Sequence, residues 1–508
     1  MLVFSPIIIF DATGGKSTIP ALMQPSYAVW FPLIIAIPWN TAMSQIENYL
    51  DEQKQQFEDD LCELLRIPSV STDGQHTAEI QAAAQYLLAQ FEQIGLKSEL
   101  IETSGNPLVY AESEPVPGRP TVLVYGHYDV QPPDPLEQWE SPPFEPTRRD
   151  GNIYARGATD DKGQLLTHVK SAEAWMKTVG KLPVQIKYLI EGEEEVGSEG
   201  LNEFMLRPET VAKLACDVVV ISDTSQFSRG QPAITYGLKG IAYFELTLQG
   251  PKQDLHSGTF GGAVTNPANT LCKLLSSLVD DQGRVLIPGF YDDVDPMSER
   301  EREQFSALPF NEHSFMEQIG VSGLSGEASY STLERRWARP TFDVNGLTSG
   351  YQAEGAKTVL PAKASAKFSF RLVPHQEAEK IATSLREHLA ALCPPGIEID
   401  LHEMHHAPGF VVSLDSPYID AAAKAIEQGF GRSPVFIREG GSIPIVTEFS
   451  EKLGVDTLLL GWGLDDDNTH SPNEKFSLAD FHRGIRSSAH LWHELGRIEK
   501  DSKPSKTS

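Results

Sequence analysis

The stretch Thr-Val-Leu-Val-Tyr-Gly-His-Tyr-Asp-Val, residues 121–130, places a histidine and an aspartate directly after an apolar run. This short run, rich in valine and ending at Gly126, predicts a buried strand. Open α/β sheets bind ligands in the crevice beyond the carboxyl ends of their strands. We therefore expect His127 and Asp129 to lie at a ligand site on such a sheet.

Other predicted strands are followed by the same kinds of residue. Strands are predicted at 184–190, 217–222 and 456–460, and a pair of aspartates stands just before a helix predicted to start at Lys162. Clustered histidine and carboxylate side chains at one sheet edge are what a pair of hydrolytic divalent cations needs. The predicted set is His127, Asp129, Asp160, Glu194, Glu195, Asp223 and His470.

Each motif has a simpler explanation when it is considered alone. A His-x-Asp match is weak, and Asp160 or Asp161 could simply cap the following helix. An acidic run such as 193–195 is usually a solvated face, and a lone His470 is more often structural. The metal interpretation is favoured because five segments place a ligand-type residue at one edge of one predicted sheet.

The order of predicted elements indicates two domains. Strands alternating with helices predict an α/β catalytic domain with a mostly parallel sheet covered by helices. An inserted part has the order β-α-β-β-α-β of a ferredoxin-like α+β unit, apart from a charged insertion at 281–340. The predicted boundaries are 1–43 for an atypical N-terminal extension, 44–238 and 406–498 for the two parts of the catalytic domain, 239–405 for the inserted domain and 499–508 for a polar tail.

The first 42 residues are apolar and poor in charge. Their longest apolar piece, near 27–38, is too short to span a membrane and contains Pro32. They lack the basic start of a signal peptide. A helix with Ser44 as N-cap is predicted right after Met43. We therefore interpret 1–42 as a non-native or disordered extension, with translation starting at Met43.

The bulk composition excludes some partners. The 508 residues carry 42 Lys and Arg against 70 Asp and Glu, a formal net charge of -28. Such acidity argues against nucleic acid or an anionic membrane as a partner. Four cysteines without paired spacing predict neither a disulfide framework nor a thiolate metal site, which is typical of a reducing cytoplasm.

Five motifs, taken in order, resemble one family of enzymes. They are Gly-His-Tyr-Asp-Val, Gly-Ala-Thr-Asp-Asp-Lys-Gly, Glu-Glu-Glu-Val-Gly-Ser, Ile-Ser-Asp and Thr-His-Ser-Pro-Asn-Glu. The family is that of the co-catalytic di-metal peptidases, which includes carnosinases, glutamate carboxypeptidases, aminoacylases and succinyl-diaminopimelate desuccinylases. The resemblance covers roughly 44–498. Segments 255–258, 370–374 and 438–444 are most similar to the carnosinase-like cytosolic non-specific dipeptidases.

The resemblance implies a role for each member of the predicted set. Asp160 would bridge two divalent metal ions. His127 and Asp223 would complete one site, and Glu195 and His470 the other. Glu194 would act as general base on a metal-bound water, and Asp129 would orient His127. The resemblance also implies a cis peptide bond between Asp160 and Asp161. Zinc suits the ligands best, with manganese or cobalt as alternatives.

The resemblance also implies residues outside the metal centre. His256, in the inserted domain, would reach the active site of a partner subunit and stabilise the oxyanion, so the inserted domain would serve as lid and dimerisation domain of a homodimer. Arg371 would bind the substrate's terminal carboxylate. Gly441 and Ser442 would line the substrate pocket.

The expected reaction is hydrolysis of dipeptides or short peptides with a free C-terminal carboxylate. One alternative is an N-acyl-amino-acid amidohydrolase that uses the same di-metal site. Another is a non-catalytic binding protein, against which the complete ligand set argues. Asp465-Asp466-Asp467 is interpreted as a solvated loop. The alternative is that these carboxylates, near His470, give the enzyme a preference for cationic substrates.

Overall fold

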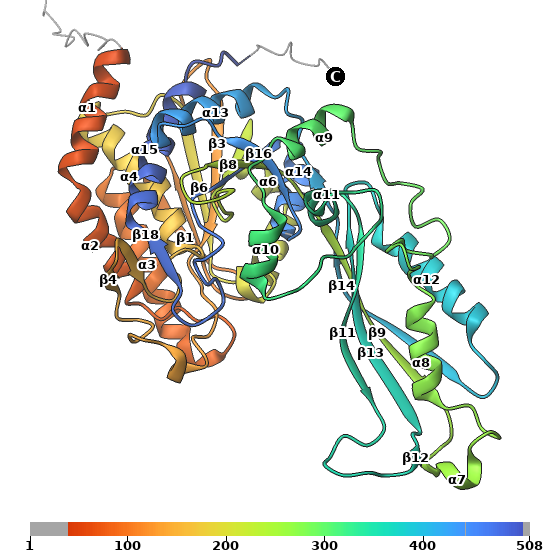
Figure 1. Cartoon of the computed structure of the whole chain (residues 1–508). Coiled ribbons are helices and arrows are strands. Elements are labelled where there is room, and N and C mark those ends of the chain that lie inside the picture. Colours follow the sequence, from red (N-terminus) through yellow and green to blue (C-terminus); the bar gives the residue numbers. More distant parts are fainter. Residues whose placement is uncertain (1–38, 442, 501–508) are drawn as a thin grey trace, which may run out of the picture.

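A computed structural model describes residues 39–441 and 443–500. A broad α/β body carries a narrower lid that projects from one side (Figure 1). None of the helices in the described ranges is long and apolar enough to cross a membrane. The site that was predicted from the sequence lies in the body.

The body is built on a nine-stranded sheet in the order β1-β2-β6-β3-β7-β17-β8-β15, with β16 paired to β8. Its central strands β6, β3, β7 and β17 run parallel, and so do β8 and β16. The predicted, largely parallel sheet is therefore confirmed. The bounds are β1 (Lys97–Ile101), β2 (Leu108–Glu112), β3 (Thr121–His127), β6 (Gln185–Glu191), β7 (Val218–Ile221), β8 (Ala233–Leu238), β15 (Phe410–Val411), β16 (Val435–Glu439) and β17 (Asp456–Gly461).

Helices cover both faces of this sheet. On one face Gly126 of β3 lies against Leu165 of α4, and on the other Tyr125 contacts the ring of Phe449 in α14 edge-on. Burial on both faces explains why the β3 sequence is almost continuously apolar. The helices are α1 (Trp39–Glu52), α2 (Lys54–Leu65), α3 (Thr77–Gln93), α4 (Lys162–Thr178), α5 (Glu199–Met205), α6 (Pro208–Leu214), α13 (Pro417–Phe430), α14 (Pro444–Leu453) and α15 (Leu478–Leu495).

The predicted start of the first helix is wrong. The helix α1 begins at Trp39 rather than after Ser44, and a second helix, α2, follows it directly. Ala42 and Met43 are buried in the main core, so tertiary packing extends the helix toward the N-terminus. The other residues of the predicted extension, 1–38, lie outside the described residues, as does 501–508 of the predicted tail.

The lid contains a four-stranded antiparallel sheet in the order β11-β13-β9-β14. This is the strand order of a ferredoxin-like unit, with α8 and α12 packed on one face. The Asn266 side chain caps the start of α8 by accepting a hydrogen bond from the Ala268 N–H. The bounds are β9 (Gly240–Gln249), α8 (Pro267–Ser276), β11 (Thr341–Ser349), β13 (Lys363–Leu372), α12 (Ala378–Leu392) and β14 (Glu398–Ala407).

Two small sheets complete the structure. At the far end of the lid, β10 (Leu255–His256) pairs with β12 (Val359–Leu360), next to the short helix α7 (Ser257–Phe260) (Figure 1). In the body, β18 (Lys475–Ser477) pairs with β5 (Asn152–Tyr154), which pairs with β4 (Thr147–Arg149). The second of these sheets connects the segment around residue 475 to the segment around residue 155.

The charged insertion at 281–340 packs at the junction of lid and body. It contains α9 (Glu299–Ser306), α10 (Glu312–Ile319) and α11 (Thr332–Trp337). Phe305 and Trp337 from these helices form a small core with Tyr236 and Ile437 of the body. A buried ion pair between Arg339 and Glu327, with N···O distances of 2.7 and 2.9 Å, holds the insertion together.

Candidate active site

Five predicted ligands from five segments of the body meet beyond the strand ends. Two groups of potential metal-ligating atoms form there, and within each group the atoms lie within 4.8 Å of one another. The first group consists of His127, Asp160 and Asp223, and the second of Asp160, Glu195 and His470. Asp160 is common to both groups, which is the arrangement expected of a carboxylate that bridges two metal ions.

The two oxygens of Asp160 point to different histidines. Oδ1 lies 3.1 Å from Nε2 of His127, and Oδ2 lies 2.9 Å from Nε2 of His470. Asp223 Oδ2 is 3.9 Å from the same nitrogen of His127, and Glu195 Oε2 is 3.3 Å from that of His470. Each imidazole therefore faces a pair of carboxylates. The peptide bond between Asp160 and Asp161 is cis, as the resemblance implied.

The His127 ring provides a direct test of whether a metal ion fits. Its side chain is fully buried, and although Oδ1 of Asp160 lies 3.1 Å from its Nε2, no described residue makes a well-aligned hydrogen bond to that nitrogen. A buried polar atom without a partner is costly. A cation between this nitrogen and the facing carboxylates would remove that cost. The donor set of imidazoles and carboxylates therefore fits divalent metal ions.

The electrostatics of the centre also fit bound cations. Burial, together with the charges of Asp160 and Asp161, raises the pKa of Asp223 well above its usual value. Burial, opposed by His127 but supported by Glu195 and Asp160, raises the pKa of Glu194 to about 7. Hydrogen bonds to Asp160 and Glu195 raise the pKa of His470 to about 10. In the absence of metal, the cluster therefore takes up protons to reduce carboxylate repulsion.

Asp129 contacts both His127 and the glutamate pair. Its Oδ1 lies 3.3 Å from Nδ1 of His127, on the opposite side of the ring from Asp160. Its two oxygens also accept hydrogen bonds from the backbone N–H groups of Glu194 and Glu195, at 3.2 and 3.1 Å. Sequence reasoning anticipated only the contact with His127. Asp129 is therefore placed to fix the turn that follows β6 as well as the imidazole ring.

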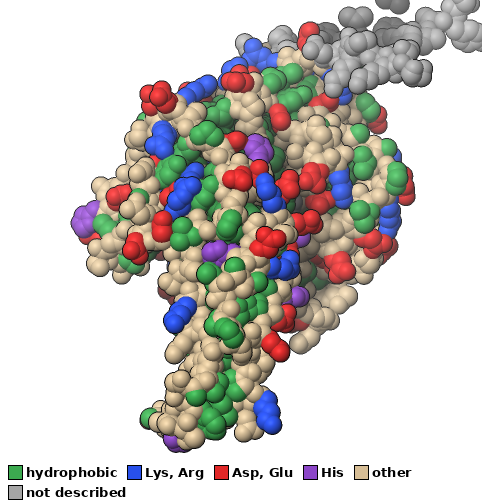
Figure 2. Space-filling model, turned by 90° about the vertical axis from the view of Figure 1, so that its right-hand side faces the viewer, with side chains coloured by type: hydrophobic (Ala, Val, Ile, Leu, Met, Phe, Trp, Pro, Cys, Tyr) green, Lys and Arg blue, Asp and Glu red, His purple; other side chains and the backbone are tan. Residues whose placement is uncertain are grey.

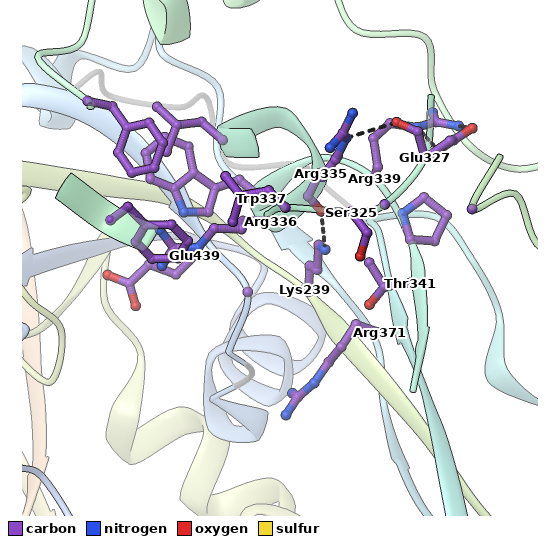
Figure 3. Close-up of a pocket in the computed structure, with 18 of the residues that line it drawn as sticks. Lys239, Ser325, Glu327, Arg335, Arg336, Trp337, Arg339, Thr341, Arg371 and Glu439 are labelled. Atoms are coloured by element: carbon purple, nitrogen blue, oxygen red, sulfur yellow. Dashed lines mark hydrogen bonds and ion pairs between the residues drawn. The ribbon is translucent and has the colours of Figure 1, made fainter. Parts of the chain in front are cut away.

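A cavity of about 1500 Å³ lies where the body, the lid and the insertion meet. Arg371 from β13 lines it (Figure 3). Gly441, from the loop after β16, lines it as well. Asp465 and Ser225, which also line it, are close in sequence to the predicted ligands His470 and Asp223. Ser442 lies outside the described residues.

His256 is not brought to the metal centre of its own chain. It lies on β10 at the exposed far end of the lid, away from the body (Figure 1). Its Nδ1 accepts a hydrogen bond from the Gly258 N–H at 3.1 Å. The neutral ring therefore carries its proton on Nε2, which can donate to another group.

Comparison with known proteins identifies the family. A model of the peptidase family M20/M25/M40 matches residues 123–494. The chain belongs to this family. The prediction of a metallopeptidase with a catalytic domain and a lid is thereby confirmed.

Individual members of the M20 family match most of the chain. The Cys-Gly metallodipeptidase of Schizosaccharomyces pombe is 34% identical over 472 residues, which cover 90% of this chain and 99% of that protein. The human Beta-Ala-His dipeptidase is 34% identical over 401 residues, covering 77% and 78%. The crystal structure of human carnosine dipeptidase 1 matches with a TM-score of 0.75 and 31% identity, covering 90% of this chain and 99% of that one. The dipeptidase prediction agrees with these relatives.

Glu474 is a residue of this M20 site whose role sequence reasoning missed. It is fully buried, and its carboxylate accepts hydrogen bonds from the backbone N–H groups of Gly157, Thr159 and Asp160 at 3.0, 3.0 and 3.2 Å. It also forms an ion pair with Arg156 at 2.7 Å. Glu474 thus holds the loop that presents Asp160. Its place at the end of the motif Thr-His-Ser-Pro-Asn-Glu was the available signal.

The interpretation of 465–467 as a solvated loop is wrong for one of its three aspartates. Asp465 and Asp466 are exposed, but Asp467 is fully buried. The Asp467 carboxylate accepts hydrogen bonds from the Thr159 hydroxyl, at 3.2 Å, and from the ammonium group of Lys475, at 2.7 Å. A buried carboxylate with a cationic partner is stable where an unpaired one is not, so Asp467 supports the Asp160 loop from its other side.

Proposed function

We propose that the chain hydrolyses dipeptides or short peptides with a free C-terminal carboxylate, with His127, Asp160, Glu195, Asp223 and His470 as metal ligands. The observation that carries this proposal is Asp160, whose two oxygens face the two histidines at 3.1 and 2.9 Å. When bound, a pair of divalent ions supplies an acidified water and polarises the scissile carbonyl.

The residues around this centre provide the remaining chemistry. Glu194 belongs to neither ligand group, so its carboxylate is available to take a proton from water and pass it to the leaving amine. Asp129 holds the backbone of Glu194 in place. Arg371 on the cavity wall would receive the substrate's terminal carboxylate through its planar guanidinium, and Gly441 and Ser442 belong to the loop beside it.

Zinc is the proposed metal, with two ions per subunit. Two imidazoles and three carboxylates suit zinc, and manganese and cobalt are alternatives for the same donors. The proposal predicts that protein purified from its source contains two equivalents of one divalent metal per chain, which elemental analysis measures directly.

We also propose a homodimer in which each lid completes the partner's active site. Support comes from His256, which lies at the far end of the lid with its Nε2 able to donate. Apolar side chains are exposed on the lid, and the lid's narrow end carries several hydrophobic side chains (Figure 2). The exposed apolar side chains of the lid as a whole include Phe260, Val344, Leu347, Tyr351 and Met404. An exposed apolar surface of this kind is typical of a protein–protein interface.

The proposed location is the cytoplasm, without nucleic acid or membrane as partner. Its support is that all four cysteines are free and the net charge is -28. The relatives that match most of the chain act, by their names, on Cys-Gly and on β-alanyl-histidine. They favour a dipeptide over an N-acyl amino acid as the substrate.

A substrate panel tests the proposed function. The metal-loaded chain should hydrolyse dipeptides such as Cys-Gly and β-alanyl-histidine, and should show little activity toward acetyl amino acids or succinyl-diaminopimelate. Preferential deacylation would select the alternative chemistry at the same site. Absence of turnover across the panel, in protein that holds its metal, would contradict the proposal.

A further inference from the structure

The insertion at 281–340 contacts the strand that leads into the proposed substrate pocket. β16 ends at Glu439, and the loop after it contributes Gly440 and Gly441 to the cavity. α11 of the insertion packs beside β16, and Arg336 of α11 lines the same cavity (Figure 3). The insertion is therefore a neighbour of this loop, although the two are far apart in the sequence.

A carboxylate of the insertion binds the strand just before this loop. Glu301, in α9, is buried, and its Oε1 forms an ion pair with the guanidinium group of Arg438 in β16. The hydroxyl of Tyr236 in β8 donates a hydrogen bond to the same oxygen at 2.5 Å. The guanidinium carbon of Arg438 lies 5.1 Å from the centre of the Tyr236 ring. Each of the three groups is thus fixed by the other two, as in other satisfied polar networks of protein interiors.

The backbone of β16 directs Arg438 toward the insertion. The pairing of β16 with β8 shifts register between Ile437 and Arg438, and irregularities of this kind re-aim side chains. The stem of Arg438 lies over Gly237 of β8, where a Cβ atom would be only 3.0 Å from its Cδ. The preceding Ile437 belongs to the same small core as Phe305 of α9. Two consecutive residues of β16 are therefore in contact with the insertion.

A third contact reaches the loop itself. At Gly440 a Cβ atom would lie 3.0 Å from the carbonyl oxygen of Arg336, in the last turn of α11. From the body, the carbonyl of Glu439 accepts a hydrogen bond from the backbone N–H of Lys239 at 3.1 Å. The Glu439 carboxylate accepts another from the Thr235 hydroxyl, also at 3.1 Å. Body and insertion thus enclose the start of the loop, and its conformation depends on both.

We propose that Glu301 is a positioning residue for substrate binding, which acts through Arg438 to fix the loop after β16. This inference rests on the proposed function, which places Gly441 in the substrate pocket. Loss of Glu301 leaves a largely buried cation without its carboxylate, which is costly. The guanidinium group escapes this cost by moving toward water, and the end of β16 moves with it. The insertion thereby sets the affinity for the peptide, whereas the metal ligands come from other segments.

A purely structural role for the pair predicts different behaviour. In that case the pair only attaches α9 to the body, and its loss lowers the free energy of unfolding without moving the loop. Glu301→Met separates the two roles, because methionine fills a similar volume and offers only a weak acceptor. Arg438→Met removes the other partner of the pair. Glu303→Met makes the same change at an exposed position of α9 and is the matched control.

The first readout is hydrogen–deuterium exchange, which does not depend on any activity. Glu301→Met should speed exchange of the backbone N–H groups in 435–441 at least about fivefold, whereas α4 in the body keeps its protection. Arg438→Met should have the same effect, and the double variant no larger one, because both changes remove one interaction. Glu303→Met should exchange like the wild type. Unchanged exchange at 435–441 in the single variants, or equally faster exchange in α4, would overturn the proposal.

Turnover gives a second and separable readout. With a dipeptide substrate and unchanged metal content, Glu301→Met and Arg438→Met should each raise KM about tenfold at nearly constant kcat, the scale of one lost hydrogen bond to a charged substrate group. A fall in kcat at constant KM, or a KM equal to that of the wild type, would overturn the proposal. An inactive wild-type protein would contradict the proposed function, whereas the exchange experiment would still decide whether Glu301 positions the loop.

Discussion

The carboxylate of Glu474 accepts a hydrogen bond from the backbone N–H of Asp160 at 3.2 Å, although the two residues are 314 positions apart. This contact connects the C-terminal part of the body to the residue shared by both ligand groups. Glu474 is held in place because β18 pairs with β5 directly beside it. The two parts of the catalytic domain are thus joined at the metal centre itself.

Glu474→Gln should weaken metal binding. An amide has one acceptor oxygen, and its NH₂ group would face N–H donors that the carboxylate now satisfies. We expect a loss of about 10- to 100-fold in metal affinity, the usual scale for residues that orient metal ligands. Competition with a chelator measures it. Asp466→Asn, an exposed neighbour of the same charge, is the control and should leave the affinity unchanged. Equal affinities of Glu474→Gln and the wild type would contradict the role assigned to Glu474.

Glu194→Gln should bind metal normally and lose at least ~100-fold in kcat, because a general base contributes on this scale. The neighbouring Glu193→Gln is the matched control. Its carboxylate accepts the Gly200 N–H at 2.9 Å, away from the ligand groups, and an amide oxygen can do the same. Steady-state kinetics and metal analysis of both variants decide the assignment. Retained turnover by Glu194→Gln would exclude it as the base.

The strand ends of the body could be predicted from sequence because local patterns determine them. The apolar run at 121–126 and the acids after 184–190 carry both the strand and its ligand-type residues. The burial of Asp467 and Glu474 could not be predicted in this way. Both lie in a polar stretch whose partners, Thr159 and Arg156, are about 300 residues away in the chain.

The insertion at 281–340 was equally difficult to interpret from sequence. Its helices α9, α10 and α11 are short, and α9 and α11 are rich in charge, so their periodicity is weak. Trp337 and Phe305 are buried in a small core that they share with Tyr236 and Ile437 of the body. Tertiary contacts of this kind also moved the start of α1 to Trp39, since Ala42 and Met43 pack in the core.

His256→Ala should abolish most turnover, and mixing it with Glu194→Gln should restore part of it. In a mixed dimer the His256→Ala chain keeps its own Glu194 and receives His256 from its partner. Random re-pairing should give up to about a quarter of wild-type activity, since half of the dimers are mixed and each has one intact site.

The mixing experiment has an internal control. When Glu194→Gln is mixed with His127→Ala, each chain carries a defect in its own metal centre, so no mixed dimer has an intact site and no activity should return. If subunit exchange is verified and the pair with His256→Ala also stays inactive, the centres are not shared between subunits.

Folding stability should fall in mild acid because of His168. This side chain is fully buried in α4, with Nε2 2.8 Å from the Ser222 hydroxyl and Nδ1 3.1 Å from that of Ser488, so it also supports the residue before Asp223. Burial lowers the pKa of His168 to about 3. The unfolded chain takes up a proton below about pH 6.5, whereas the folded chain resists it. This residue therefore favours unfolding increasingly as the pH falls from 6.5 toward 3.

Comparison of His168→Gln with the wild type isolates this contribution, because all other titrating groups are shared. Glutamine should cost stability at pH 7.5, where it replaces a well-packed neutral ring. By pH 5 the difference should shrink by about 2 kcal/mol, since each pH unit between the two pKa values is worth about 1.4 kcal/mol. Denaturant unfolding at the two pH values measures it. A difference in stability that stays constant between pH 7.5 and 5 would show that His168 does not resist protonation in the folded chain.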